Sequence, residues 1–208
     1  MSWFSKILKW LSMKKQEKRL NIILFGPPGS GKGTQAKMLE EKFGLLQIST
    51  GDLFRYELGN NTDLGKKARE YMDKGQLVPD EVTIAMLERK MKKHPEVNGY
   101  ILDGFPRTIA QCEALDSFLK SRDEQVDRLI ALVVPEKELI TRLLERGKTS
   151  GRSDDANEDV IQNRINVYQK ETAPVFGYYD EKGLSVEIEG VGAIDEIHER
   201  LSSLISTL

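Results

Sequence analysis

Short apolar runs alternate with longer stretches of helical periodicity along this chain. The runs IILF at 22–25 and LIALVV at 129–134 are apolar on both faces, as expected for strands that helices cover on both sides of a parallel sheet. The pattern therefore predicts an α/β fold, a three-layer α/β/α sandwich around a five-stranded parallel sheet. The expected strands span residues 20–25, 46–49, 100–102, 128–134 and 184–188.

Helical periodicity fills the stretches between these strands. The expected helices span residues 32–43, 80–93, 108–120, 137–146 and 194–204. Residues 147–156 are rich in small and charged side chains, which is typical of a surface loop between two helices.

The first nineteen residues are expected to be an extension that ends in the charged linker KKQEKR. Within residues 1–13 a helical wheel separates an apolar arc from a polar one, a pattern typical of a helix lying in a membrane interface. We therefore expect reversible attachment to anionic membranes. Two alternatives remain: this helix docks onto the surface of its own domain, or the extension is not part of the natural protein. The apolar arc holds Trp3, Phe4, Ile7, Leu8, Trp10 and Leu11, and the polar arc holds Ser2, Ser5, Lys6, Lys9 and Ser12.

Composition narrows the class of protein. A length of 208 residues suits one domain, expected at 20–208, and a net charge of -2 gives no overall attraction to nucleic acid. The single cysteine, Cys112, cannot form an intrachain disulfide. No apolar run is long enough to span a membrane, and Lys6 and Lys9 interrupt any secretory signal. We expect a cytoplasmic monomer.

Residues 26–34, GPPGSGKGT, stand between a predicted strand and a predicted helix. In that context the glycines let successive backbone N–H groups turn onto phosphate oxygens, and the helix adds the positive end of its dipole. Lys32 then reaches the β and γ phosphates. Because Gly33 separates Lys32 from Thr34, a magnesium role for the Thr34 hydroxyl stays open. The candidate phosphate-binding residues are Gly29, Ser30, Gly31, Lys32, Gly33 and Thr34.

Three further sets of residues decide the class. STGDLFR occupies 49–55, YILDGFPR occupies 100–107 with Thr108 and Gln111 after it, and arginines stand at 142, 146, 152 and 164. Together with GPPGSGKGT, and from residue 20 to the end, they resemble the adenylate kinase family, which transfers a phosphoryl group from ATP to AMP. The resemblance implies a P-loop NTPase fold with a helical acceptor-binding insertion at 49–78 and a short lid at 147–155.

The resemblance also assigns residues to the two nucleotides. Asp103, at the end of an apolar strand, is implied as the Mg²⁺ partner acting through water, with a helix cap as the alternative. Arg142, Arg146 and Gly192 are implied at ATP, although Arg142 alone suits a solvated surface equally well. The implied catalytic residues are Lys32, Arg107, Arg146, Arg152 and Arg164. The implied AMP contacts are Thr50, Gly51, Arg55, Gln76, Leu77, Val78, Gly104, Phe105, Pro106, Arg107, Gln111, Arg152 and Arg164.

In such a reaction the nucleophile is a phosphate oxygen of AMP, which is largely ionised near neutral pH because its second pKa is about 6. No general base is needed, and His94 and His198, outside every motif, are expected at exposed helix positions. Water would compete as acceptor, so closure of the insertion and the lid is expected. Gly147 and Gly151 would ease rotation of the lid.

Other functions stay open on the sequence. The UMP/CMP kinase family shares the phosphate loop, DGFPR and the lid, but usually has alanine in place of Thr50 and often asparagine in place of Thr108. Thr50 and Gln111 therefore favour AMP. A catalytically silent nucleotide-binding module should lack at least one of the charged residues, and none is missing. A switch GTPase lacks support because the chain has no NKxD-type motif.

Overall fold

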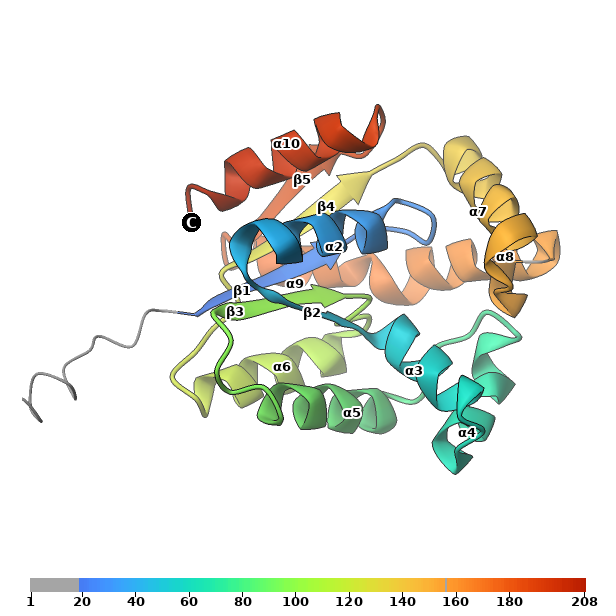
Figure 1. Cartoon of the computed structure of the whole chain (residues 1–208), viewed down its shortest axis with the longest axis horizontal. Coiled ribbons are helices and arrows are strands. Elements are labelled where there is room, and N and C mark those ends of the chain that lie inside the picture. The colour runs from blue at the N-terminus through green and yellow to red at the C-terminus, as the bar shows by residue number, and fades with distance from the viewer. Residues whose placement is uncertain (1–18, 156) are drawn as a thin grey trace, which may run out of the picture.

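The computed structural model describes residues 19–155 and 157–208. They form a five-stranded parallel sheet in the order β2-β3-β1-β4-β5, with helices on both faces (Figure 1). The predicted three-layer α/β fold is therefore confirmed. The strands are β1 (Leu20–Phe25), β2 (Leu46–Ser49), β3 (Gly99–Asp103), β4 (Arg128–Val133) and β5 (Ser185–Glu189).

Side-chain caps fix where several helices begin. Ser49 Oγ accepts a hydrogen bond from the N–H of Asp52 at 3.3 Å, and Thr108 Oγ1 accepts one from the N–H of Gln111 at 3.2 Å. The helices are α2 (Lys32–Phe43), α3 (Thr50–Gly59), α4 (Asp63–Met72), α5 (Asp80–Lys92), α6 (Ile109–Lys120), α7 (Glu136–Ser150), α8 (Glu158–Val167), α9 (Pro174–Asp180) and α10 (Ile194–Ile205), with a 3₁₀ turn η1 (Ser153–Asp155) and a π-helical turn η2 (Tyr168–Thr172).

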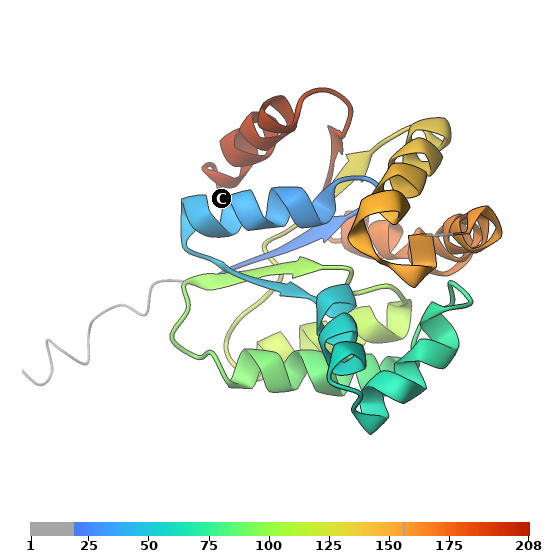
Figure 2. The same ribbon diagram turned by 45° about the vertical axis from the view of Figure 1, so that its right-hand side comes forward.

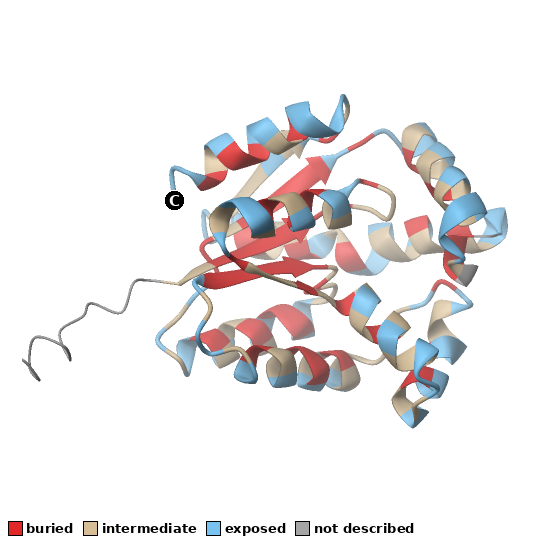
Figure 3. Cartoon of the chain, viewed as in Figure 1, coloured by how far each residue is buried: buried red, intermediate tan, exposed pale blue. Residues whose placement is uncertain are grey.

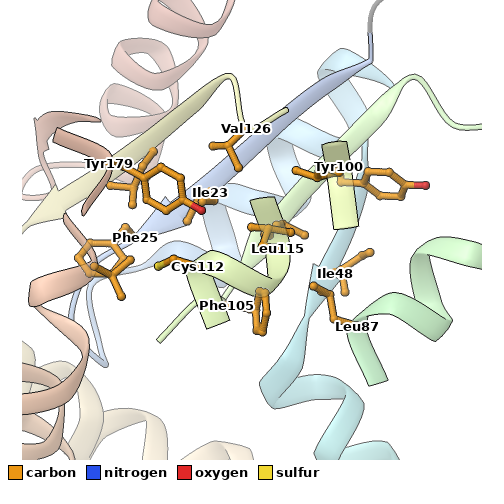
Figure 4. Close-up of a cluster of buried hydrophobic side chains, with 14 of the residues drawn as sticks. Ile23, Phe25, Ile48, Leu87, Tyr100, Phe105, Cys112, Leu115, Val126 and Tyr179 are labelled. Carbon is orange, nitrogen blue, oxygen red and sulfur yellow. The ribbon is translucent and has the colours of Figure 1, made fainter. Parts of the chain in front are cut away.

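Strand β1 joins the two hydrophobic layers of the domain. Ile22 and Leu24 pack with residues of α2 and α10, whereas Ile23 and Phe25 pack with residues of α5, α6 and α9. Figure 4 shows part of the second layer, and in Figure 3 the central strands are buried while the helices keep exposed outer faces. Burial on both sides explains why the strand reads as a continuous apolar run.

Two helical units extend beyond the carboxyl ends of the strands, where Figure 2 shows them facing each other. Phe54, Ala68 and Val78 form a small core for α3 and α4, with Met86 of α5. Leu143, Ile161 and Ile165 form another between α7 and α8. Each unit thus has its own packing and is joined to the main domain by short connections.

Helix α7 shows that the helix end predicted at residue 146 was wrong. The helix continues to Ser150, and Gly151 ends it with a φ of 63°. A Cβ on Gly147 would lie 2.3 Å from the carbonyl oxygen of Asp155. This glycine therefore allows η1 to pack closely against the helix and does not start a loop. The expected surface loop is partly helical, and both Asp154 and Asp155 within it are buried.

The histidines also differ from the prediction of exposed helix positions. His94 lies just beyond the end of α5 and is partly buried. His198 lies in α10, also partly buried, with Nε2 3.2 Å from Ser202 Oγ.

Residues 1–18, and with them the expected membrane-interface helix at 1–13, lie outside the described part of the chain. Among the residues that the structure does describe, no helix combines the length and the apolar character needed to cross a bilayer.

Candidate active site

A cavity of about 690 Å³ opens at the carboxyl ends of the central strands. In open α/β sheets this edge is where ligands bind. The cavity brings together the phosphate loop after β1, the segment that begins α3, the end of β3 with the following turn, and arginines from α7 to α8. Of the predicted site residues, those that line it are Gly29, Gly31, Lys32, Gly33, Thr34, Thr50, Gly51, Arg55, Gln76, Leu77, Val78, Asp103, Gly104, Phe105, Pro106, Arg107, Gln111, Arg146, Arg152 and Arg164.

The phosphate loop wraps around the Lys32 side chain. Its Nζ donates to the carbonyl oxygens of Gly26 at 2.7 Å and Pro27 at 2.8 Å, and to Ser30 Oγ at 3.2 Å. Gly31 caps α2 with a φ of 93°, a conformation that suits glycine. Residues 31–34 at the start of this helix line the cavity, and the beginning of a helix next to a cavity is a favourable place for an anion.

Burial lowers the pKa of Lys32 to about 8. The negative charge of Asp103 raises this pKa, whereas the positive charges of Arg107, Arg146 and Arg164 lower it further. The cavity therefore holds a surplus of positive charge, which favours a highly charged anion.

Neighbouring oxygens fix two arginines of the cavity wall, one on α3 and one in the turn after β3. Arg107 Nε donates to the carbonyl oxygen of Gly104 at 2.7 Å, and Arg55 Nη2 donates to Asp52 Oδ1 at 2.6 Å. A Cβ on Gly104 would lie 2.8 Å from Arg107 Nη2, and one on Gly51 2.8 Å from Arg55 Nη2. Both glycines therefore make room for a guanidinium group at the cavity wall.

Asp52 links this side to the segment that follows α7, because its Oδ1 also lies 3.7 Å from Arg152 Nη2. Partial burial favours the neutral carboxyl, but the hydrogen bond and charge of Arg55, with Ser49 and Arg152, hold the pKa of Asp52 below its usual value. Asp52 thus stays ionised between two arginines at neutral pH.

Asp155 pairs with arginines from both sides of η1. Arg146 reaches it with two hydrogen bonds, Nε to Oδ2 at 2.6 Å and Nη2 to Oδ1 at 3.0 Å. Arg164 Nη1 contacts the same carboxylate and lies 3.1 Å from Asp154 Oδ2. Burial opposes ionisation, but these arginines hold the pKa of Asp155 below its usual range. The carboxylate therefore fixes two cavity-lining cations in place.

Thr50 and Gln111 add two hydrogen-bonded polar side chains to the cavity wall. Thr50 Oγ1 donates to the carbonyl oxygen of Gly104 at 2.8 Å. Gln111 is 1% exposed, accepts a hydrogen bond from the N–H of Arg107 at 2.8 Å and donates to Asp80 Oδ1 at 2.6 Å. A planar base could contact such oriented polar groups through hydrogen bonds along one edge.

Three predicted site residues do not line the cavity. Ser30 is buried within the loop. Arg142 pairs with Glu138 at 2.9 Å and donates to the carbonyl oxygen of Gly190 at 3.3 Å, so it lies beside the turn between β5 and α10. Gly192, in the same turn, is exposed with a φ of 122°. Arg142 and Gly192 are therefore on neighbouring segments outside the cavity.

Several residues of the site were missed by sequence reasoning. Asp52 lies inside the STGDLFR motif that was recognised, and the acidic pair Asp154–Asp155 follows Arg152 after one serine. In both places an acidic residue lies close in the sequence to a candidate arginine, and this was the available signal. Tyr168 and Thr172 line the cavity from η2, and no sequence pattern marks such a π-helical turn.

Asp103 is the residue that could hold a divalent cation. Its Oδ2 lies beside the phosphate loop, since a Cβ on Gly33 would be 3.5 Å from it. Within the described ranges no three His, Cys, Asp or Glu side chains form a metal-binding group. One carboxylate still fits Mg²⁺, which is usually bound by one or two carboxylates with phosphate oxygens and water.

The parallel sheet and the cavity beside the glycine-rich loop place the chain in the P-loop class of phosphate-binding proteins. The family model for adenylate kinase matches residues 24–184. The adenylate kinase of Flavobacterium johnsoniae is 52% identical over 189 residues, which is 91% of this chain and 100% of that protein. That of Flavobacterium psychrophilum is also 52% identical over the same shares, and that of Bacteroides fragilis 47%. The chain belongs to the adenylate kinase family.

Proposed function

We propose that this chain catalyses reversible phosphoryl transfer from Mg-ATP to AMP, giving two ADP, and so balances the adenine nucleotides. The observation that carries the proposal is one cavity that joins the phosphate loop to the segments around residues 50–55, 76–78 and 103–111, with cationic side chains among them. Membership of the adenylate kinase family supports the same reaction.

On the donor side, the amides of residues 29–34 and the Lys32 ammonium bind the ATP phosphates. Arg146 neutralises charge on the transferred group, Arg142 contributes to binding ATP, and the backbone of Gly192 contacts the donor adenine. Mg²⁺, held by Asp103 through water, supplies further charge neutralisation when bound.

On the acceptor side, Arg55 and Arg107 bind the AMP phosphate, because a guanidinium fork matches two phosphate oxygens. Thr50, Gln111 and the backbone of residues 76–78 hold the base. Gly51, Gly104, Phe105 and Pro106 shape the wall between base and phosphate. Arg152 and Arg164 contact AMP and also neutralise charge on the phosphoryl group as it is transferred.

Catalysis in this scheme rests on positioning and charge, since the acceptor phosphate is itself the nucleophile. Asp52 and Asp155 hold arginines that line the cavity, and phosphate oxygens can take over these contacts as the nucleotides bind. Exchange of carboxylate for phosphate would draw the insertion at 49–78 and the lid at 147–155 over the ligands. Such closure would exclude water as a competing acceptor.

A coupled assay with AMP, UMP and CMP as acceptors tests the reaction. We expect turnover with AMP to exceed that with either pyrimidine nucleotide by a large margin, and Lys32→Met to abolish all three. Higher turnover with UMP or CMP would contradict the proposed acceptor. Activity of Lys32→Met near wild type would contradict the phosphate site.

We further propose a cytoplasmic monomer that attaches reversibly to anionic membranes through residues 1–13. Lys6 and Lys9 within an otherwise partly apolar stretch support this attachment. Co-sedimentation with anionic vesicles at low and high salt should pellet the full chain but not a form that starts at residue 16. Equal, negligible pelleting of both forms would exclude attachment, and size-exclusion chromatography tests the oligomeric state.

A further inference from the structure

Asp80 ties the first turn of α5 to the beginning of α6. Its Oδ2 accepts a hydrogen bond from Thr108 Oγ1 at 2.8 Å, and its Oδ1 accepts one from Gln111 Nε2 at 2.6 Å. Thr108 is the N-cap of α6, and Gln111 lies in the first turn of that helix. One carboxylate thus holds two residues of a segment that borders the cavity.

Two hydrogen bonds, one to the oxygen and one to the nitrogen of the Gln111 side-chain amide, favour the same orientation of that amide. Its Oε1 accepts from the N–H of Arg107, while its Nε2 donates to Asp80. A backbone N–H can only donate and an ionised carboxylate can only accept, so a flipped amide would face two mismatched partners. Because Gln111 is buried, such mismatches are costly.

These contacts leave one N–H and one oxygen lone pair of the amide for a ligand. A 6-aminopurine offers an amine donor at position 6 and an acceptor at N1, which match that lone pair and that N–H. A 6-oxopurine reverses both groups, because its O6 accepts and its N1–H donates. The orientation of one amide can therefore discriminate between two purines of nearly equal shape.

We propose that Asp80 is a specificity-determining positioning residue, which orients the Gln111 amide to bind a 6-aminopurine and to reject a 6-oxopurine. Gln111 lines the cavity, whereas Asp80 lies behind it and does not. Asp80 therefore acts through Gln111. The inference rests on the proposed function, because it takes Gln111 as the residue that binds the acceptor base.

The test compares AMP with inosine monophosphate as acceptor at saturating Mg-ATP, in the full chain and in Asp80→Asn. Asparagine keeps the shape but can either donate or accept, so only the N–H of Arg107 still opposes a flipped amide. We expect the ratio of kcat/KM for AMP over inosine monophosphate to fall about tenfold. The KM for AMP should rise, while kcat at saturating AMP stays close to wild type.

Two variants control for general effects. Glu81→Gln removes an exposed carboxylate from the same helical turn. Thr108→Val loosens the same segment but leaves Asp80 facing Gln111. Both should keep the ratio within about twofold of wild type. An unchanged ratio in Asp80→Asn, or an equal fall of both kcat/KM values, would overturn the positioning role.

Gln111→Ala separates this inference from the proposed function. It should collapse the discrimination between the two purines. If it does so while Asp80→Asn does not, only the role of Asp80 fails. If discrimination survives in Gln111→Ala, Gln111 does not bind the base, and both the base assignment and the inference drawn from it are wrong.

Discussion

At the scale of single residues, burial and the neighbouring arginines disfavour the charged form of the Lys32 side chain. With a pKa of about 8, its ammonium is close to losing its proton under mildly alkaline conditions. A triphosphate would supply the negative charge that the cavity lacks and would restore the proton. Nucleotide binding and protonation should therefore be linked through this one side chain.

We predict that ATP binds about tenfold more weakly at pH 9 than at pH 7, because at pH 9 most molecules must first take up a proton at Lys32. Calorimetric titration in two buffers of different ionisation enthalpy would measure both the affinity and the proton uptake. In Lys32→Arg, whose charge does not titrate in this range, the dependence on pH should largely disappear. Equal wild-type affinity at both pH values would contradict the linkage.

Arg107 offers a test of guanidinium geometry. We predict that Arg107→Lys lowers kcat/KM for AMP on the order of a hundredfold, because lysine keeps the charge but loses the fork that binds two phosphate oxygens. The backbone N–H that holds Gln111 remains, so the preference for AMP over inosine monophosphate should persist. Arg89→Lys, at an exposed position of α5, is the matched control. Wild-type kinetics in Arg107→Lys would remove Arg107 from the acceptor site.

Residues whose role depends on a local motif could be predicted from the sequence. Lys32 follows from a strand, a glycine-rich loop and a helix in order, and Asp103 from its place at the end of an apolar strand together with the family resemblance. The structure places both beside one cavity. Asp80 could not be found in this way. Its contact with Gln111 joins residues 31 positions apart, and nothing local marks that pairing.

At the scale of elements, Gly147 shows how a glycine can be misread. A glycine at this place in a sequence suggests the end of a helix, but Gly147 lies within α7. The position needs glycine because the backbone of η1 packs too close to leave room for a side chain. The next glycine, Gly151, has the left-handed φ that ends the helix. The choice between the two depends on a tertiary contact, so local pattern alone could not make it.

We predict that Gly147→Ala lowers the free energy of unfolding by about 1–3 kcal/mol and reduces turnover, because the new methyl group must displace the backbone of Asp155. Gly177→Ala is the matched control, a helical glycine of α9 where the added carbon would meet no atom within 4 Å apart from its chain neighbours and its own helix backbone. It should be neutral or stabilise slightly. Denaturant titration of both variants gives the comparison, and equal effects would contradict the close packing at Gly147.

Asp155 connects α7, η1 and α8 through its two arginines. Folding lowers the pKa of this carboxyl below its ordinary value of 3.8. The ionised carboxylate therefore stabilises the fold at pH values above 3.8, and this contribution is lost as the pH falls through the lower pKa of the folded state. We predict that Asp155→Asn costs about 2 kcal/mol of unfolding free energy at pH 7, since Arg146 loses its charged partner and Arg164 keeps only Asp154. The cost should shrink toward pH 3.

Unfolding of Asp155→Asn and wild type by urea at both pH values would check this dependence. Asp159→Asn, which removes an exposed carboxylate from the first turn of α8, is the control. A deficit of equal size at pH 7 and pH 3 would show that the lost charge is not the cause.

At the scale of the whole molecule, the sandwich was predictable because strands buried on both faces leave continuous apolar runs. The strand order was not, since it depends on which edges pair after the chain has folded back on itself. The pairing of β1 with both β3 and β4, for example, joins segments more than seventy residues apart. The cavity likewise collects residues from Leu24 to Thr172, and only the resemblance of several motifs to one family linked them in advance.

The direction of the strands separates the beginning of β1 and the carboxyl terminus from the cavity. Strand β1 begins and α10 ends at the edge of the sheet opposite the phosphate loop (Figure 1). Cys112 is the only cysteine, is fully buried, and has a thiol pKa raised to about 12 by burial, so it should react poorly with thiol reagents. A cysteine introduced at Leu208 would thus be the reactive one. It would allow attachment of a fluorophore or a solid support at a single known point, with the cavity directed away from the anchor.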